Sequence, residues 1–368
     1  MILGIDVSTY FEEEAVGAKY YHNGKEIDPL KQFINQGVNY MRIRVWNNPY
    51  SLDGKPYLGG SCDEDNFIKL AKKAQEYGYH IILDLHYSDF WADPNKQTCP
   101  KEWQGLEFEK IVQNVENFTK KVLIHAKNEN INVEYIQIGN ETTHGMIWPY
   151  GRLDYSVKPH GNFDKLTTLF KAGIKGAKEI FPEIKTIIHL ERSFDQAVYY
   201  EYFDQLRKYN VEFDVIGMSY YPYWHGNFDE FFANVNMCKK EFHKDVMVME
   251  LGYGFTLEDY LLTNNGVNHM VINEESAKEF IDKLPYPISK EGQGKFIKRF
   301  LELCRENEVL GVNYWEPLWI PGNGICWASK EGQEYINEVG KSTRNEWANQ
   351  CFFDYEGRAN PAFDEYKQ

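Results

Sequence analysis

The chain has 368 residues, of which 43% are hydrophobic, and its 55 acidic and 40 basic residues give a net charge of −15 at pH 7. A chain of this length and hydrophobic share can bury a large core, so intrinsic disorder is excluded. The negative charge repels phosphate backbones and the sequence has no run of 18 apolar residues, so we expect neither a nucleic-acid partner nor a membrane span.

Strand-like apolar runs alternate with amphipathic helical stretches from one end of the chain to the other. Because eight strands separated by helices form a parallel sheet that closes on itself, we predict a single catalytic (β/α)8 barrel (TIM barrel) domain over residues 1–368. An open, doubly wound sheet is the main alternative, but it needs a glycine-rich turn after the first strand, and Asp6-Val7-Ser8-Thr9 is not one. The predicted strands are residues 2–7, 38–45, 80–85, 133–138, 186–190, 213–218, 246–249 and 310–314, and the predicted helices include 65–77, 108–127, 163–180 and 293–306.

The first residues, from Met1 to Asp6, have the pattern of a strand and not of a signal peptide. We therefore expect a cytoplasmic protein, or a secreted one if a signal peptide has been removed. The six cysteines form no CxxC pair, which excludes zinc-ribbon and thioredoxin-like classes. We expect the protein to be a monomer.

Polar and aromatic residues gather directly after the predicted strands, where such a barrel carries its chemistry. Two carboxylates stand out: Glu141 follows the fourth strand in Gly139-Asn140-Glu141, and Glu250 ends the seventh in Val248-Met249-Glu250. A carboxylate at the end of a hydrophobic strand is costly unless it faces a polar cavity or a partner. Strands four and seven lie across the barrel from each other, so the two glutamates can face each other over its mouth.

Two opposed carboxylates are what glycosidic hydrolysis needs, because one protonates the leaving oxygen and the other attacks the anomeric carbon or activates water. A separation of roughly 5–5.5 Å gives retention of configuration, and one of roughly 6.5–9.5 Å gives inversion. The alternative is a pair of structural glutamates, each held by a salt bridge. His86 and His189 also end strands and would suit a metal-dependent hydrolase, but no HxH pair follows the first strand.

Several blocks of sequence match a known family from the first strand to the last. The longest and most specific is Leu83-Asp84-Leu85-His86-Tyr87-Ser88-Asp89-Phe90-Trp91-Ala92-Asp93-Pro94. The others are Gly4-Ile5-Asp6-Val7-Ser8, Arg42-Ile43-Arg44-Val45-Trp46, Gln137-Ile138-Gly139-Asn140-Glu141, Gly145-Met146-Ile147-Trp148-Pro149, Ser219-Tyr220-Tyr221-Pro222 and Tyr314-Trp315-Glu316-Pro317-Leu318-Trp319. On these blocks the chain resembles glycoside hydrolase family 53, the endo-β-1,4-galactanases that cleave type I arabinogalactan.

The resemblance implies retaining endo-hydrolysis of a polysaccharide or oligosaccharide substrate, β-1,4-galactan. It implies that Glu141 is the acid/base and Glu250 the nucleophile. It also implies that Arg42 and Tyr221 support Glu250 and keep it ionised, with Arg44 on the same side as Arg42. An acid must be protonated near neutral pH, so we expect a raised pKa for Glu141.

The resemblance further assigns substrate-binding residues around the two glutamates. His86 and Asn140 would line the cleavage subsite. Trp315 and Trp319 would stack against galactosyl rings, and Asp89 and Trp91 would lie nearby. The substrate-binding residues that the resemblance implies are thus Arg42, Arg44, His86, Asp89, Trp91, Asn140, Tyr221, Trp315 and Trp319.

The sequence departs from the family pattern at two places. Leu251 follows Glu250 where the family usually has Thr, which is the one feature that favours a glycan-binding barrel without activity. Bacterial members can hold a structural calcium between strands seven and eight, but residues 256–269 here contain Glu258 and Asp259 without the dense aspartate run of calcium loops. We therefore expect no cofactor for catalysis and assign no metal-binding residue, and a structural calcium in this loop is left as an open alternative.

The irregular segment 254–290 also leaves the mode of action open. Loops on this face of a barrel shape the distal part of a substrate cleft. A related retaining β-glycanase, or an exo-acting galactan hydrolase, is thus the second interpretation of the sequence.

Overall fold

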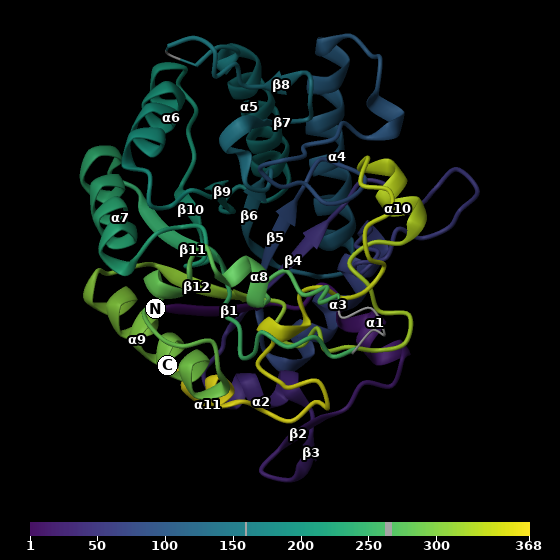
Figure 1. Ribbon diagram of the computed structural model, residues 1–368. Coiled ribbons are helices and arrows are strands. Elements are labelled where there is room, and N and C mark those ends of the chain that lie inside the picture. Colours follow the sequence, from purple (N-terminus) through teal and green to yellow (C-terminus); the bar gives the residue numbers. More distant parts are fainter. Residues whose placement is uncertain (159, 262–266) are drawn as a thin grey trace.

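The computed structural model describes residues 1–158, 160–261 and 267–368 and shows a closed barrel of parallel strands (Figure 1). This confirms the predicted (β/α)8 architecture, and each strand lies within two residues of its predicted bounds. In the order in which neighbours pair around the barrel, the strands are β1 (Ile2–Asp6), β12 (Gly311–Trp315), β11 (Asp245–Leu251), β10 (Val215–Tyr220), β9 (Lys185–Leu190), β6 (Val133–Ile138), β5 (His80–Leu85) and β4 (Tyr40–Val45).

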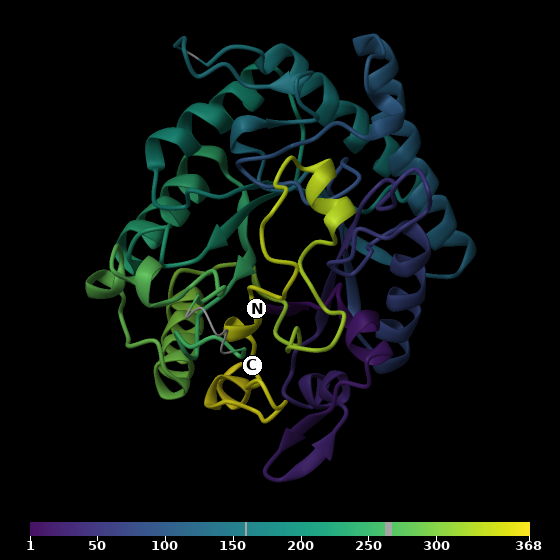
Figure 2. The same cartoon turned by 45° about the vertical axis from the view of Figure 1, so that its right-hand side comes forward.

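Helices surround the barrel (Figures 1 and 2), and the four that the sequence predicts are among them. The α-helices are α1 (Tyr10–Ala15), α2 (Pro29–Asn35), α3 (Glu64–Tyr77), α4 (Phe108–Asn128), α5 (Phe163–Ile180), α6 (Gln196–Lys208), α7 (Phe228–Phe242), α8 (Glu274–Ala277), α9 (Lys290–Glu306), α10 (Lys330–Tyr335) and α11 (Pro361–Glu365). The 3-10 helices are η1 (Lys101–Trp103), η2 (Thr142–His144), η3 (Ile281–Lys283) and η4 (Ala348–Gln350), and two small hairpins pair β2 (Tyr20–His22) with β3 (Lys25–Ile27) and β7 (Gly145–Met146) with β8 (Gly151–Arg152).

Local signals in the sequence set the ends of these helices. The side chain of Asp63 accepts a hydrogen bond from the backbone N–H of Asn66 at 2.8 Å, and Gly78 ends α3 in the left-handed conformation with φ +94°. Helix α7 begins with a reciprocal capping box between Asn227 and Glu230. Such caps satisfy backbone groups that the helix itself leaves without partners.

Two layers of side chains fill the barrel interior, and their chemistry differs. Six buried side chains form an apolar layer, and the charged and polar groups that follow them along the strands form a second layer. Residues in between on the same strands, such as Met41 and Ile43, belong instead to the large core between strands and helices, as the two-residue period requires. The apolar layer consists of Tyr40, Ile82, Ile187, Val215, Met247 and Met249, and the polar layer includes Asp6, Arg42, Asp84, Gln137, His189 and Ser219.

An irregularity in β11 breaks the alternation just where the strand ends. The register of β11 shifts against both neighbouring strands, between Val248 and Leu251 on the β12 side and opposite Met218 and Ser219 on the β10 side. Met249 belongs to the interior layer, while the next residue, Glu250, lines the cavity at the barrel mouth. A β-bulge re-aims side chains in this way. Leu251 is then buried in the outer core, so the departure from the family pattern lies outside the cavity.

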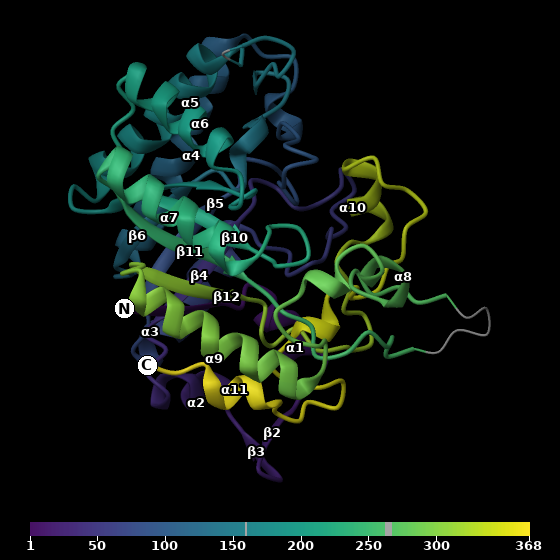
Figure 3. The ribbon, with the colours of Figure 1, turned by 60° about the vertical axis from the view of Figure 1, so that its left-hand side comes forward.

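The segments that connect strands to helices lie over one end of the barrel, and the chain termini lie at the other (Figure 3). Residues 316–360, after β12, cross the barrel mouth and carry α10 and η4 (Figure 2). The predicted irregular segment 254–290 contains α8 and η3; its residues 262–266, part of the loop considered for calcium, lie outside the described residues. None of the described helices is long and apolar enough to span a bilayer.

Candidate active site

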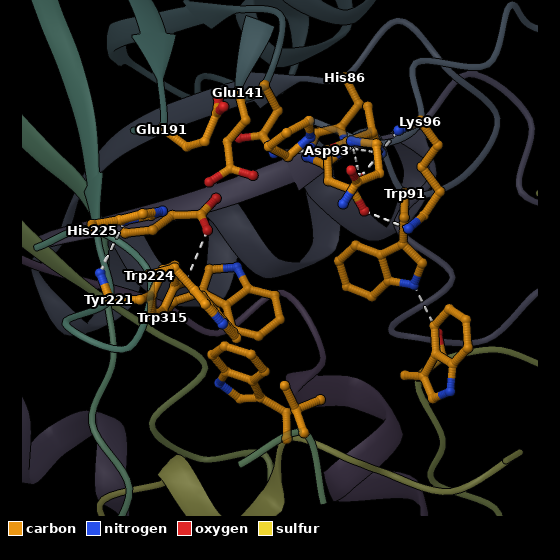
Figure 4. A pocket seen from close by; sticks show the side chains of 18 of the residues that line it. His86, Trp91, Asp93, Lys96, Glu141, Glu191, Tyr221, Trp224, His225 and Trp315 are labelled. Carbon is orange, nitrogen blue, oxygen red and sulfur yellow. Dashed lines mark hydrogen bonds and ion pairs between the residues drawn. The ribbon is translucent and has the colours of Figure 1, made fainter. Parts of the chain in front are cut away.

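A cavity of about 740 Å³ lies where the connecting segments meet at the carboxyl ends of the strands. In Figure 4, the labelled side chains of His86, Glu141 and Glu191 reach into it from one side and the ring of Trp91 borders another. Of the residues predicted to form the site, eight line this cavity: His86, Trp91, Asn140, Glu141, Tyr221, Glu250, Trp315 and Trp319. Arg42, Arg44 and Asp89 do not line it.

A tight turn after β6 presents Glu141. Gly139 has φ +81°, and a Cβ atom there would lie 2.8 Å from the side chain of Thr142, so the position needs glycine for both reasons. Glu141 itself adopts a left-handed conformation with φ +46°, and Ser219 Oγ lies within hydrogen-bonding distance of its Oε1 at 2.5 Å. Burial, together with the negative charges of Glu250 and Glu191, raises the pKa of Glu141 well above its ordinary value.

The surroundings of Glu250 are different. Its Oε1 lies 3.2 Å from the guanidinium of Arg42, and its Oε2 accepts a hydrogen bond from the hydroxyl of Tyr221 at 2.9 Å. Burial raises the pKa of Glu250 above its ordinary value, whereas Arg42 and Tyr221 favour the ionised form and oppose that rise. The cation and the phenol contact only this member of the pair, so Glu250 ionises first and its charge then holds the proton on Glu141.

The two carboxylates are close neighbours. An oxygen of Glu141, an oxygen of Glu250 and a ring nitrogen of His189 all lie within 4.8 Å of one another. That bound on the oxygen–oxygen distance lies near the roughly 5–5.5 Å spacing of retaining glycosidases and below the roughly 6.5–9.5 Å spacing of inverting ones.

Arg42 is buried beneath the pair and does not touch the cavity. Its guanidinium binds Asp6 and Asp84 at 2.8 Å each, besides Glu250. It is therefore placed to support Glu250, but it is shielded from substrate, contrary to its inclusion among the substrate-binding residues.

Arg44 and Asp89, which were predicted to bind substrate, do not line the cavity and are held by internal partners. Arg44 forms an ion pair with Glu316 at 2.6 Å and lies over the ring of Trp91 at 4.4 Å, behind the cavity wall. Asp89 accepts the backbone N–H of Lys101 at 2.7 Å and binds that lysine's ammonium at 3.0 Å. Both side chains are fully buried away from the cavity because their charges are satisfied by these internal partners.

His86 and Asn140 are held in fixed orientations on the cavity wall. Nδ1 of His86 accepts hydrogen bonds from the indole of Trp46 at 3.3 Å and from the backbone N–H of Ala92 at 3.2 Å, so its Nε2–H faces Asp84 at 3.0 Å. Asn140 accepts a hydrogen bond from Arg42 at 2.9 Å and donates one to the backbone oxygen of Ala92 at 2.9 Å. Both groups are thus preorganised before any substrate arrives.

Tryptophan rings form the rest of the wall, but not all of them offer a free face. Trp91 and Trp315 are partly exposed and lie 6.0 Å apart between ring centroids. Trp319 is only 1% exposed and packs against both, at 6.3 and 5.9 Å. Trp319 therefore supports the two rings, and its predicted role as a stacking surface is not favoured by this placement.

Several cavity residues were not among the predicted site residues, and three of them bear on the chemistry of the site. Glu191 follows β9, and its pKa is raised to about 7 by burial, although Thr143 donates a hydrogen bond to it at 2.6 Å. Trp224 is 47% exposed and Trp347 lies 4.9 Å from Trp315 between ring centroids. The strand-end rule that found Glu141 also applies to Glu191, whereas the two tryptophans lie in connecting segments whose path the sequence pattern does not reveal.

Among the described residues, the one group of side chains with a metal-ligand arrangement is Glu141, His189 and Glu250. Its chemistry does not suit a cation, because both nitrogens of His189 are in hydrogen bonds and the Arg42 guanidinium already lies against Glu250. In the loop considered for calcium, Asp259 accepts the backbone N–H groups of Leu261 and His269. Its carboxylate is therefore occupied by the loop itself.

Paired, unequal glutamates at the mouth of a (β/α)8 barrel, among tryptophan rings, are typical of enzymes that hydrolyse glycosidic bonds. The chain is a glycoside hydrolase. The sequence profile of Glycosyl hydrolase family 53 matches residues 2–366, and the chain belongs to that family.

Similar proteins cover the whole chain. An "Endo-beta-1,4-galactanase" of Bacillus subtilis (strain 168) is 32% identical over 386 residues, which span 100% of this chain and 85% of the relative. The GH53 catalytic domain of Ignisphaera aggregans has 35% identity and a TM-score of 0.87, with 99% of this chain and 95% of that one covered. A structure from a study of two fungal beta-1,4-galactanases has 25% identity and a TM-score of 0.76, with 100% and 98% covered.

Proposed function

We propose that this enzyme hydrolyses internal β-1,4-galactosidic linkages of galactan and type I arabinogalactan with retention of configuration. The observation that carries the proposal is the close, asymmetric pair of Glu141 and Glu250, in which Arg42 and Tyr221 contact only Glu250. The names of the relatives support the choice of galactan as substrate.

In the first step, Glu141 donates its proton to the glycosidic oxygen while an oxygen of Glu250 attacks the anomeric carbon. The carbon–oxygen bond to the leaving sugar breaks, and a glycosyl ester on Glu250 forms. In the second step, Glu141, now ionised, takes a proton from water, whose oxygen attacks the anomeric carbon and releases Glu250. After the second step the enzyme is in its starting state, with the proton on Glu141.

The cavity wall suits a sugar polymer. The partly exposed rings of Trp91, Trp224 and Trp315 offer flat apolar faces. The indole N–H groups of Trp319 and Trp347 have no hydrogen-bond partner among the described residues, although both rings border the cavity. A buried donor without a partner is unfavourable unless a ligand accepts its hydrogen bond, and sugar hydroxyl groups can do so.

The test is hydrolysis of purified β-1,4-galactan beside mannan, xylan and β-glucan, followed by measuring new reducing ends. We expect galactan to be the preferred substrate, with oligosaccharides of mixed length among the early products. Release of monosaccharide from the outset would indicate an exo-acting enzyme, and activity on another glycan alone would contradict the substrate. Proton NMR of the first products distinguishes retention, which gives the β-anomer, from inversion.

A further inference from the structure

Ser219 and His189 lie behind Glu141 and are not used in the reaction steps above. A continuous chain of buried hydrogen bonds joins them to the acid. Nδ1 of His189 lies 3.0 Å from Oδ1 of Asn140, its Nε2 lies 2.9 Å from Oγ of Ser219, and that Oγ lies 2.5 Å from Oε1 of Glu141. The donor and acceptor of each hydrogen bond follow from the partners of Asn140, at the end of this series that is remote from Glu141.

The orientation of Asn140 sets the first direction. The Arg42 guanidinium contributes only donors, so the Asn140 atom that it contacts at 2.9 Å must be the amide oxygen. The amide NH₂ of Asn140 correspondingly faces the backbone oxygen of Ala92 at 2.9 Å. Since Oδ1 can only accept, Nδ1 of His189 must carry a hydrogen and donate it.

The surroundings of His189 set the second direction. Burial, and then the charge of Arg42, lower the pKa of His189 well below its ordinary value, so the ring is neutral. A neutral imidazole with its hydrogen on Nδ1 has a bare Nε2, which can only accept. The hydroxyl proton of Ser219 is the donor to that nitrogen. The charged groups with the largest influence on the pKa of His189 are Arg42 on β4, Asp84 on β5, His86 after β5 and His225 after β10. The carboxylates of Glu141 and Glu250 also lie within 4.8 Å of the ring.

A serine hydroxyl has one proton and two lone pairs. Once Ser219 donates to His189, it can only accept from Glu141, and Glu141 has a hydrogen to give only in its acid form. We propose that Ser219 and His189 are positioning residues that hold the proton on Glu141 until the glycosidic oxygen takes it. This proposal rests on the proposed role of Glu141 as the acid/base.

This arrangement of hydrogen bonds changes when Glu141 is ionised. The Glu141 carboxylate and Nε2 of His189 then both need the one hydroxyl proton of Ser219. The group that does not receive it is left facing the lone pairs of the serine oxygen at hydrogen-bonding distance. Ser219 turns toward Glu141 in that state and leaves Nε2 without a donor, which makes the ionised form less favourable. The negative charges that raise the pKa of Glu141 are those of Glu250 on β11, Glu191 after β9 and Asp93 after β5, and Tyr221 and His189 are further ionisable neighbours. A hydrogen bond donated by Ser219 to the carboxylate would instead lower this pKa, so the direction of that bond decides the sign of its effect.

The test is the pKa of Glu141 itself, measured by carbon NMR on protein labelled at the glutamate carboxyl carbon, with the signal assigned through Glu141→Gln. In Ser219→Ala the acid loses its acceptor, so we expect this pKa to fall by about one unit. A serine that acts mainly as a donor to the carboxylate would give the opposite sign. An unchanged or raised pKa in Ser219→Ala therefore overturns the proposal.

A second variant tests the histidine. His189→Phe keeps a ring but removes Nε2, which frees Ser219 to donate to the carboxylate, so the pKa of Glu141 should again fall. The double variant should show less than the sum of the two shifts, because both act through one hydroxyl. Full additivity contradicts the shared chain. Ser193→Ala is the matched control, since it removes another buried hydroxyl, one that bonds the backbone oxygen of Ser219 at 2.7 Å, and should leave the pKa unchanged.

Kinetics separate this inference from the proposed function. With galactan, the basic limb of the pH profile of kcat/KM should move to lower pH in Ser219→Ala. With a dinitrophenyl galactobioside, whose leaving group needs no proton, the loss in kcat/KM should be several-fold smaller. A protein that leaves galactan intact but shows the NMR shift would contradict the substrate and keep the positioning role. A protein that cleaves galactan but shows no NMR shift would contradict the positioning role and leave the proposed substrate intact.

Discussion

Glu141 and Glu250 are both buried at one cavity, and the neighbours of each decide its protonation. Glu250 has Arg42 and Tyr221 within hydrogen-bonding distance, whereas Glu141 faces further carboxylates. In the proposed mechanism, activity on the acidic side is therefore lost when Glu250 takes up a proton, because a protonated carboxyl cannot attack. On the basic side it is lost when Glu141 gives up its proton, so the pH profile of kcat/KM should be bell-shaped.

Glu141→Gln removes the proposed proton donor while keeping the size of the side chain. We predict that kcat/KM on galactan falls by roughly 10²–10⁴-fold and that the basic limb of the pH profile disappears. Initial-rate measurements between pH 4 and pH 9 check both. Glu191→Gln is the control at a neighbouring buried carboxyl, and its basic limb should persist. If Glu191→Gln instead abolished that limb, the two roles would have to be exchanged.

Glu13 is a further buried carboxyl, outside the cavity, and neither of its oxygens has a partner within normal hydrogen-bonding geometry among the described residues, although the Tyr20 hydroxyl lies close enough to oppose the rise in its pKa. Burial, followed by the charges of Glu316 and Glu12, raises its pKa well above the ordinary value. The folded state therefore holds a proton that the unfolded chain releases near pH 4. This stabilises the folded state least at neutral and basic pH, since the stability falls as pH rises above the unfolded pKa.

Glu13→Gln removes this dependence on pH. We predict a free energy of unfolding higher by on the order of 1–3 kcal/mol at pH 8 and little changed at pH 4, as measured by urea denaturation at both values. Glu76→Gln, at an exposed position, should change neither value. A destabilised Glu13→Gln at pH 8 would show that the buried carboxylate has a stabilising ionic role.

The sequence correctly placed at the cavity those residues whose position follows from a strand end, such as Glu141, Glu250 and His86. The sequence did not distinguish Arg44 and Asp89, which lie outside the cavity, from residues that line it, because a charged residue beside a strand end looks the same in sequence whether it faces the cavity or an internal partner such as Glu316. The partner comes from a distant segment, and only the folded chain brings the two together.

At the scale of elements, the irregularity in β11 is what aims Glu250 at the cavity. The sequence alone placed a glutamate at the end of a strand, but strict alternation after Met249, whose side chain is inside, would turn the next residue outward. The register shift has no signal of its own in the run of residues 246–250. Strand bounds could thus be predicted to within two residues, while the bulge could not.

The segment between β10 and α7 contributes Trp224, whose ring is 47% exposed at the cavity edge. We predict that Trp224→Ala raises KM for galactan by about 3- to 10-fold with little change in kcat, because the lost stacking concerns binding more than the reacting centre. Tyr200→Ala is the control, since Tyr200 is 46% exposed on α6 and does not line the cavity. Equal effects of both variants would remove Trp224 from the substrate cleft.

At the scale of the whole molecule, the C-terminal segment helps to close the barrel. Tyr366, just after α11, is fully buried, and its single hydroxyl proton is shared between the backbone oxygens of Gly4 on β1 and Val312 on β12, which lie 2.5 and 3.0 Å from the hydroxyl oxygen. The same hydroxyl accepts the backbone N–H of Tyr314 at 3.1 Å. In Figure 3, α11 lies beside α9 on the outside of these strands.

Removal of this one hydroxyl should therefore lower the stability of the whole fold. We predict that Tyr366→Phe lowers the free energy of unfolding by about 1–3 kcal/mol, because it leaves buried backbone groups without a partner. Chemical denaturation measures the loss, and the specific activity of the folded variant should be unchanged. Tyr77→Phe, which removes a hydroxyl that bonds Asp28 at an exposed position, is the control and should cost less. A loss no larger than that of Tyr77→Phe would contradict the closing role of Tyr366.

The architecture of the whole molecule was the part most accessible from sequence. Alternating apolar runs and amphipathic stretches, such as 133–138 followed by 163–180, are short-range patterns that carry the barrel topology. The path of residues 316–360 across the barrel mouth is a long-range property, set by packing of residues such as Trp347 against Trp315. Those tryptophans shape the cavity, so the sequence predicted its two glutamates better than its walls.

In the proposed mechanism, Glu250 attacks the anomeric carbon of the sugar while Glu141 supplies the proton to the leaving oxygen. The most direct measurement is to trap the covalent intermediate with a 2-deoxy-2-fluoro-β-galactobioside that carries a dinitrophenyl leaving group, and to locate the label by mass spectrometry of the digested protein. We predict one added glycosyl group per chain, on the peptide that contains Glu250. A label on Glu141, Glu191 or another residue would contradict it.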